Sequence, residues 1–458
     1  MDLAHDDAQD KRDAFHLSLA QLECSPGSGG MLAGFIGNAY EAGCLDECVE
    51  FLVDLAGKRP DDAELLNYTA GLLGEMGRKG QSRAFAKMAA ACKPFFPSKV
   101  KNAKVQVLAL QCIATADYKY SPRGGRFFLP GMANLCTLLD PDIAVHRLLV
   151  DDPAAALAAV KWLPKCDIVF NAISDPDYEE ALRNAATLCD SLELPVFNHP
   201  RRVRAMNRVA LPAILRGKSD MLMAAGTVYL PPERAENSDI AAAMQSNRLG
   251  FPVIVRAPGF QGGRQMALVR DENDEPGREL YRGNGLYIIE FVDVSFQDRR
   301  AEECFFYPKY RAFFVNRRLF PMHLFVSDQF EVHRRTSVLV HARHPWLKER
   351  EADFLRNPER HLPAGRWSAL EKAMASVGLD YFGVDFAVSA RPEDGGKLVL
   401  FECNPAMRNG IAFFPEGDPI QRQWRSVTLA AHNALCAKSG VAAWPFVLKK
   451  GLLFSPGG

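Results

Sequence analysis

The sequence predicts a multidomain protein that combines α/β and α+β parts. Three observations support this prediction: helical spacing of apolar residues over 31–97, alternation of buried strands and helices over 101–200, and a dense series of strands from about 226 onward. The predicted parts are a flexible N-terminal segment at 1–30, a helical repeat-like region at 31–98, an α/β domain at 99–200, an α+β domain at 201–445 and a tail at 446–458.

The composition is that of an ordinary folded chain. Its 458 residues include 55 Lys plus Arg and 55 Asp plus Glu, so no excess of positive charge favours nucleic-acid binding. No apolar run approaches the roughly 20 residues that cross a bilayer, and the acidic start MDLAHDDAQDKRD lacks the apolar core of a signal peptide. The 11 Cys show no paired CxxC spacing. We therefore expect a cytoplasmic protein with reduced thiols that binds neither nucleic acid nor membranes.

The helical region at 31–98 contains an internal repeat. At an offset of 34 residues a Gly, an aromatic residue and a Pro recur in matching places: Gly43 with Gly77, Phe51 with Phe85, and Pro60 with Pro94. This resembles a tetratricopeptide-type helix pair repeated twice. Two copies rarely stand alone, so we expect the region to pack on the rest of the chain, where it binds a partner protein or carrier peptide or simply braces the sheet. The alternative is an unrelated four-helix segment.

Between 99 and 200 the pattern indicates a parallel sheet. Continuous apolar runs at 104–113, 142–150 and 166–172 are typical of strands covered on both faces, and 195–198 is a last short strand. Helical patterns at 153–163 and 178–192 predict βαβ connections. The segment HPRRVRAMNR, which follows, leads into a predicted helix that carries Arg208.

From 226 onward the predicted strands follow one another closely. They are rich in aromatic and β-branched residues and lie at 251–257, 264–270, 286–292, 309–326, 381–388 and 397–404. Helical patterns at 238–249 and 367–377 lie between them.

The last two strands carry the most informative residues. They flank the turn residues RPEDGG and predict an antiparallel hairpin. Side chains alternate faces along a strand, so Glu402 and Asn404 point the same way and Asp385 can share their face, while Cys403 points away. Oxygen ligands without Cys or His suit Mg²⁺. The alternative is a structural acidic pair satisfied by Arg.

A second segment offers groups for phosphates. The strand that ends at Arg256 is followed by PGFQGG, in which Gly259, Gly262 and Gly263 let backbone N–H groups approach an anion. By itself this pattern also fits an ordinary hairpin.

In combination these segments resemble the ATP-grasp superfamily of carboxylate–amine and carboxylate–thiol ligases. FPVIVRAPGFQGG resembles the family's strand and glycine-rich lid, YIIEFVD its adenine-binding linker, and GVDF with LFECNP its metal-binding hairpin. The resemblance covers about 201–437. It implies an ATP-grasp fold there, preceded by a Rossmann-like pre-grasp domain at 99–200.

The resemblance also implies roles for individual residues. Asp385, Glu402 and Asn404 fall on the metal positions, with Glu402 bridging two Mg²⁺ ions. Arg256 and Arg208 fall where the family has phosphate-binding lysines, although Arg is a planar fork and Lys a point charge, and Arg208 also reads as a surface cation. The adenine and ribose positions fall on four consecutive linker residues: Glu290, Phe291, Val292 and Asp293.

Further basic residues are candidates for catalysis. Lys309 and Arg311 lie two apart on a strand and present two cations on one face, where they can neutralise a transferring phosphoryl group. The alternative is ion pairing with the nearby acids Glu302 and Glu303. Arg408, just past ECNPAM, is a candidate for binding the substrate carboxylate or its acyl phosphate.

Two histidines lie ten residues apart on neighbouring strands. A zinc site built on His323 and His333 lacks a third ligand at suitable spacing. We therefore expect substrate contacts or core histidines here.

These motifs predict an ADP-forming carboxylate–amine ligase that uses ATP and Mg²⁺, with Mn²⁺ as an alternative ion. A carboxylate of a small molecule or peptide becomes an acyl phosphate, and an amine or thiol then displaces phosphate. A homodimer is the default expectation. Two other classes stay open: a non-catalytic nucleotide-binding module on a helical-repeat adaptor, and a kinase that stops at the phosphorylated product. The sequence does not name the acid or the amine.

Overall fold

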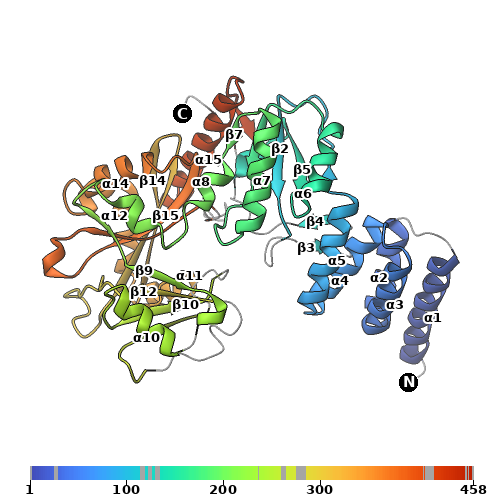
Figure 1. Ribbon diagram of the computed structural model, residues 1–458, viewed down its shortest axis with the longest axis horizontal. Helices are drawn as coiled ribbons and strands as arrows, with labels where there is room; N and C mark the ends of the chain where they lie inside the picture. The colour runs from blue at the N-terminus through green and yellow to red at the C-terminus, as the bar shows by residue number, and fades with distance from the viewer. Residues whose placement is uncertain are drawn as a thin grey trace. The chain divides into compact units, whose positions relative to one another are not determined.

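A computed structural model describes most of the chain (Figure 1). The described residues are 3–24, 29–113, 119–121, 126–128, 135–235, 237–258, 265–274, 285–405, 407, 417–448, 451 and 453–455. They belong to two compact units. One comprises Met1–Met132, Asp142–Ile173 and Glu180–Val196, and the other comprises Ala133–Pro141, Ser174–Glu179 and Phe197–Gly458.

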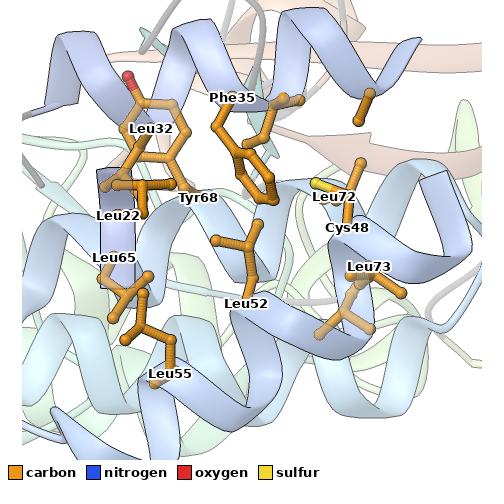
Figure 2. Close-up of a cluster of buried hydrophobic side chains, with 14 of the residues drawn as sticks. Leu22, Leu32, Phe35, Cys48, Leu52, Leu55, Leu65, Tyr68, Leu72 and Leu73 are labelled. Atoms are coloured by element: carbon orange, nitrogen blue, oxygen red, sulfur yellow. The ribbon is translucent and has the colours of Figure 1, made fainter. Parts of the chain in front are cut away.

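The first unit begins with a helical region built around one apolar core. Its helices are α1 Leu3–Cys24, α2 Gly29–Ala42, α3 Leu45–Lys58, α4 Ala63–Glu75 and α5 Lys79–Cys92. Figure 2 shows side chains from these helices that point toward one another, among them Leu22, Phe35, Leu52 and Leu72. The helical prediction for 31–97 is confirmed up to Cys92, where α5 ends, and is wrong for Phe95–Phe96, which form a short strand.

The prediction of a flexible segment over 1–30 is wrong for residues 3–24, which form α1. Phe15, Leu19 and Leu22 recur at helical spacing, and Phe15 and Leu22 are buried in the core of the helical region. The many charged residues at the start of the chain hide this apolar stripe from a composition-based analysis.

The positions that repeat in the sequence also correspond in the structure. Gly43 follows α2 with a φ of 69°, and Gly77 follows α4 with a φ of 78°. Both glycines thus provide the left-handed conformation in which helices commonly end. Phe51 lies on α3 and Phe85 on α5. The tetratricopeptide-type character of the region stays a prediction.

The parallel sheet of the first unit follows the predicted strands. Its order is β1-β5-β2-β6-β7, and β2 pairs in parallel with both β5 and β6. The bounds are β1 Phe95–Phe96, β2 Val105–Gln111, β5 Ile143–Leu149, β6 Ile168–Asn171 and β7 Val196–Phe197, with helices α6 Pro153–Ala159 and α7 Glu179–Leu192 and a small hairpin of β3 Lys119–Ser121 and β4 Arg126–Phe128. Strand β1, which pairs antiparallel with β5 at the edge of the sheet, was not predicted from the sequence.

The helical region packs on this sheet, as expected. Ala70, Ala86 and Ala90 of α4 and α5 form one apolar cluster with Leu149 of β5 and Ile113. Local capping signals define several helix starts: Asp62 caps α4, and Asp152 followed by Pro153 begins α6.

Two larger sheets lie in the described part of the second unit. The four-stranded antiparallel sheet has the order β11-β10-β12-β9, and the five-stranded sheet has the order β14-β13-β15-β16-β8. The strands are β8 Leu222–Ala224, β9 Thr227–Leu230, β10 Val253–Arg256, β11 Met266–Val269, β12 Leu286–Glu290, β13 Tyr307–Val315, β14 Arg318–Ser327, β15 Tyr381–Val388 and β16 Leu398–Asn404, with a hairpin of β17 Phe446–Val447 and β18 Leu453–Phe454.

The helices of the second unit accompany these sheets. They are α8 Pro200–Arg204, α9 Leu211–Leu215, α10 Asn237–Ser246, α11 Arg334–Arg343, α12 Trp346–Arg356, α13 Pro358–His361, α14 Arg366–Ala375 and α15 Pro419–Lys438. Helices α11, α12 and α15 contact β14, and α10 contacts β9.

The predicted fold class is confirmed: the chain is a multidomain protein of mixed α/β and α+β architecture. Among the residues that the structure describes, no helix combines the length and the apolar character needed to span a bilayer.

Candidate functional site

The β15–β16 hairpin brings the predicted metal-binding residues to one face of the five-stranded sheet. Asp385 lies opposite Glu402, and Gly383 lies opposite Asn404. Directly opposed residues of an antiparallel pair share a face. Asp385 is 2% exposed and Asn404 8% exposed, so both residues are buried on this face of the sheet.

Two β-bulges lie next to these predicted metal-binding residues. The register places Asp385 opposite Glu402 but Phe386 opposite Leu400, which leaves Phe401 as the extra residue on β16. The β13–β14 pair has a second shift after Arg311, with Met322 as the extra residue on β14. Bulges re-aim neighbouring side chains and are common beside active sites.

Strand β13 adds two cations to the same face. Arg311 lies opposite Asp385 and donates two hydrogen bonds to it, Nε to Oδ1 at 2.8 Å and Nη2 to Oδ2 at 2.9 Å. Lys309 Nζ lies 3.6 Å from Asp385 Oδ2. The ion pairing that the structure records for both cations is with Asp385, not with Glu302 or Glu303.

Glu402 faces a pocket with an empty volume of about 460 Å³. Arg208 Nη2 donates to Glu402 Oε2 at 2.6 Å, and Tyr287 Oη donates to Asp177 Oδ1 at 2.7 Å. The pocket is lined by a mixture of basic, acidic and apolar residues, including Asp175, Asp177, Arg208, Arg256, Tyr287, Glu402 and Asn404. The residues that line the pocket lie in the loop after β6, in the segment after α8, and in or next to strands β10, β12 and β16.

The predicted helical position of Arg208 is wrong. Helix α8 ends at Arg204, and Arg208 lies in the turn before α9. Arg208 is also not a surface cation, since its side chain is 19% exposed and bonded to Glu402. The next helix, α9, begins only at Leu211 and has its proline in the first turn, a position that favours a helix start.

The charges in this pocket act strongly on one another. Burial alone would raise the pKa of Glu402, but the charges of Arg208, Arg256 and Lys309 outweigh it and hold the pKa well below its usual range. Burial, reinforced by the nearby charge of Arg208, lowers the pKa of Arg256 to about 10. Burial likewise lowers the pKa of Lys309. Glu402 is therefore ionised at neutral pH, as a metal ligand must be.

The donor set fits a hard divalent cation. Within the described ranges, no three His, Cys, Asp or Glu side chains gather as a metal-binding group. Asp385, Glu402 and Asn404 instead present two carboxylates and an amide on adjacent strands, which matches the oxygen ligands and small number of carboxylates typical of Mg²⁺ bound with phosphates. Both carboxylates are held by arginines that can also bind phosphate.

The predicted adenine-binding linker runs from the end of β12. The Glu290 carboxylate accepts hydrogen bonds from the Gly226 N–H at 3.2 Å and from Arg391 Nη1 at 2.8 Å. Arg391 Nη2 also donates to the Phe291 carbonyl at 2.5 Å. Asp293 Oδ1 accepts the Ser295 N–H at 2.9 Å, so its carboxylate stabilises the turn that follows the linker.

An apolar cluster adjoins the charged row. Val292 and Val294 of the linker are buried with Ala387 and Val399, and Tyr307 and Phe401 pack half-buried against them. Ala387 follows Asp385 by two positions and Tyr307 precedes Lys309 by two, so both lie on the charged face. One sheet face thus has an apolar end and a charged end. A nucleotide is divided in the same way, with a planar base at one end and a charged phosphate chain at the other.

Four predicted site residues lie outside the described part of the chain: Gly259, Gly262 and Gly263 of the glycine-rich turn, and Arg408. Arg256, at the end of β10, is the described part of the phosphate segment. The phosphate-binding role of the glycine-rich turn and the substrate-binding role of Arg408 stay predictions.

Several residues of the site were not predicted from the sequence, among them Asp175, Asp177 and Arg391. Asp175 and Asp177 follow β6, and ligands often bind at the carboxyl ends of parallel strands, so this position was a usable signal. Arg391 lies in the hairpin turn and was not recognisable, because its partners Glu290 and Phe291 are about 100 residues away.

Gly383 explains how the chain after β16 can lie against β15. A Cβ at this position would come within 2.7 Å of Met407 Cβ. The absence of a side chain at Gly383 therefore leaves room for Met407 against the strand.

No protein-family model matches the chain. Solved structures similar to it include D-alanine–D-alanine ligase from Bacillus anthracis, with a TM-score of 0.42 and 11% identity over 73% of this chain and 99% of that one. Another is N5-carboxyaminoimidazole synthetase from Staphylococcus aureus complexed with ADP, with a TM-score of 0.40 and 11% identity over 72% and 78%. A RimK domain protein ATP-grasp from Sphaerobacter thermophilus has a TM-score of 0.38 and 15% identity over 72% and 98%.

With TM-scores below 0.5 and identities of 11–15%, these similarities assign no substrate or reaction to this chain. The geometry of this chain's own residues is what bears on its function.

Proposed function

We propose that the protein is an ATP- and Mg²⁺-dependent ligase that activates a substrate carboxylate as an acyl phosphate for attack by an amine, releasing ADP and phosphate. One observation carries the proposal. The in-register residues Glu402, Asp385 and Arg311 form a charged row on the same sheet face as an apolar cluster that can receive a base.

The charge balance of the site supports the binding of ATP together with Mg²⁺. Four cations surround the two hairpin carboxylates, namely Arg208, Arg256, Lys309 and Arg311. With Asp175 and Asp177 in the same pocket, four basic side chains meet four carboxylates. ATP⁴⁻ bound with two Mg²⁺ adds no net charge to such a site. A triphosphate without metal ions would instead be repelled by the four carboxylates.

The chain's own residues would share the work as follows. Val292, Tyr307 and Phe401 would contact the base, and Arg208 and Arg256 would bind phosphate oxygens in bidentate fashion. Asp385, Glu402 and Asn404 would hold Mg²⁺, which supplies neutralisation of the triphosphate charge.

Phosphoryl transfer then needs positioning and charge neutralisation more than covalent catalysis. A substrate carboxylate oxygen attacks the γ-phosphorus as the bond to ADP breaks. Lys309 and Arg311 would neutralise the charge that develops on the transferring group. The amine forms a C–N bond with the acyl carbon as the C–O bond breaks and phosphate leaves.

A second candidate function has a specific observation in its favour. Asp385 and Glu402 are each already bonded to an arginine, Arg311 and Arg208. Such pairing also fits a module that binds nucleotide without metal and without turnover.

Product analysis tests the proposal. Purified protein is incubated with ATP, a panel of acids and a panel of amines, with Mg²⁺ or with EDTA, and ADP and phosphate are measured separately. Equal amounts of ADP and phosphate, only with acid, amine and Mg²⁺ together, are expected. ADP without phosphate would indicate a kinase. Nucleotide binding by calorimetry without turnover would favour the non-catalytic module, and no binding at all would reject both.

A further inference from the structure

The charged row extends one strand further than the proposed function requires. Arg311 of β13 lies opposite Asp385 on one side and opposite His323 of β14 on the other. Glu402, Asp385, Arg311 and His323 therefore form a continuous line across four strands, at about 4.8 Å per strand. His323 stands at the end farthest from Glu402.

The imidazole of His323 is held in place from several sides. Its ring stacks on Phe325, with centroids 4.8 Å apart at 24°, and the Arg311 guanidinium lies over the same Phe325 ring at 5.4 Å. Nδ1 lies 3.4 Å from Glu351 Oε1 of α12, and Glu351 also accepts the Leu324 N–H at 3.1 Å. His323 is 9% exposed.

The partner at Nδ1 decides the tautomer. A carboxylate accepts hydrogen bonds, so the contact with Glu351 favours the tautomer in which Nδ1 of His323 is the donor. Nε2 is then the basic nitrogen of the ring. A histidine oriented by a carboxylate is suited to take a proton from a substrate.

His333 provides a contrast. Its side chain accepts the N–H groups of Arg335 and Thr336 and caps α11. The two histidines of the sequence motif therefore differ in kind, since one caps a helix and the other ends the row of site residues.

We propose that His323 is the general base that deprotonates the acceptor amine, with Glu351 as its positioning residue. The inference rests on the proposed function. In this proposal the acyl group of the acyl phosphate lies toward β14 while the transferring phosphoryl group lies beside Lys309 and Arg311. As the amine nitrogen forms the C–N bond and phosphate leaves with the C–O electron pair, one N–H proton passes to His323 Nε2 and then to solvent.

Hydroxylamine separates this step from the first half-reaction. It is largely unprotonated at neutral pH and attacks acyl phosphates without a base, so hydroxamate formation reports acyl phosphate formation alone. An acid and an amine that support ADP release in the wild type are used. His323→Gln is expected to lower amide formation at least about 100-fold, the usual contribution of a general base, while hydroxamate formation stays within about threefold.

Two further variants distinguish catalysis from a structural role. Added imidazole should restore amide formation by His323→Ala, because a small base can occupy the space left. Glu351→Gln should lower amide formation by about 10-fold and spare hydroxamate formation. His16→Gln, on the exposed face of α1, is the matched control and should change neither product.

Several outcomes would overturn the proposal. Equal loss of amide and hydroxamate in His323→Gln would place the residue in the first half-reaction or in the fold, and unchanged amide formation would remove it from catalysis. Failure of imidazole to restore His323→Ala would count against a base. Failure of the proposed function looks different, because the wild type itself would then form neither ADP nor hydroxamate with any acid.

Discussion

Arg311 holds Asp385 through two parallel hydrogen bonds, at 2.8 and 2.9 Å, from the neighbouring strand of the same sheet. Asp385 is almost fully buried. A buried carboxylate is stable only when it is paired or bound to a cation. The bidentate pair therefore keeps the central carboxylate of the site paired and oriented before any ligand arrives.

Breaking this pair should cost stability. We expect Asp385→Leu alone to lower the free energy of unfolding by about 3 kcal/mol, because it leaves the Arg311 guanidinium without its partner. Asp385→Leu combined with Arg311→Met should recover most of that loss while ADP formation stays absent. Urea unfolding and product assays measure the two effects. A single variant as stable as the wild type would show that the pair does not support the fold.

Glu402→Gln should abolish turnover with little change in shape. The amide can still accept the hydrogen bond from Arg208, but it removes the charge that opposes Arg208, Arg256 and Lys309. We expect a loss of at least about 100-fold in the rate of ADP formation and about 1–2 kcal/mol in stability. Glu303→Gln, at an exposed position, is the matched control. Near-normal kcat in Glu402→Gln would remove this residue from the mechanism.

Arg256→Lys should keep substantial activity. Lysine preserves the positive charge at the end of β10 but not the planar fork, so we expect kcat within about 10-fold of the wild type. Arg256→Met, which removes the charge, should lose at least about 100-fold. Steady-state kinetics with varied ATP would compare the two variants. If both are equally inactive, the fork geometry itself is required.

Asn198 should be essential for the start of β15. Its side chain accepts the N–H groups of Asp380 and Tyr381 at 2.8 and 3.0 Å and donates to the Tyr381 carbonyl at 2.6 Å. Its φ is 55°, a left-handed conformation that asparagine tolerates. We expect Asn198→Ala to cost about 3 kcal/mol and Asn198→Gly about 1 kcal/mol less, because glycine relieves the backbone strain but restores no hydrogen bond. Equal stability of all three proteins in urea would contradict this role.

Asp151 should make stability depend on pH. Burial raises the pKa of its carboxyl to about 6, despite the hydrogen bonds from the Ile113 N–H and the charge of Lys87. The folded state therefore binds more protons than the unfolded state between about pH 4 and 6. The contribution of Asp151 is fully present below the unfolded pKa and is lost as the pH rises through the folded one.

Asp151→Asn removes this titration and can still accept the Ile113 N–H. We expect the variant to gain stability relative to the wild type as the pH rises from 4 to 7, by up to about 3 kcal/mol at 1.36 kcal/mol per pK unit. Unfolding experiments in urea at several pH values measure the difference. Parallel stability curves for the two proteins would contradict it.

Local patterns were sufficient to predict much of the architecture. The parallel strands at 105–111, 143–149 and 168–171 and the hairpin of β15 and β16 follow from apolar runs and turn residues within short windows. The strict alternation of side chains along a strand also predicted that Glu402 and Asn404 share a face.

Long-range pairing could not be predicted in the same way. The bonds from Arg208 to Glu402 and from Tyr287 to Asp177 join residues 194 and 110 positions apart. Helix α1 appeared to be a flexible segment because its burial depends on a core supplied by α2–α4. The two bulges at Phe401 and Met322 depend on how neighbouring strands align, and no local signal specifies that alignment.

By itself the sequence determined which residues lie on these strands and which of them share a face. The reason is local: successive side chains of an extended strand point to opposite faces of the sheet. Only the tertiary structure decided that Glu402, Asp385, Arg311 and His323 stand in one row, since strand order and register depend on the packing of the whole sheet.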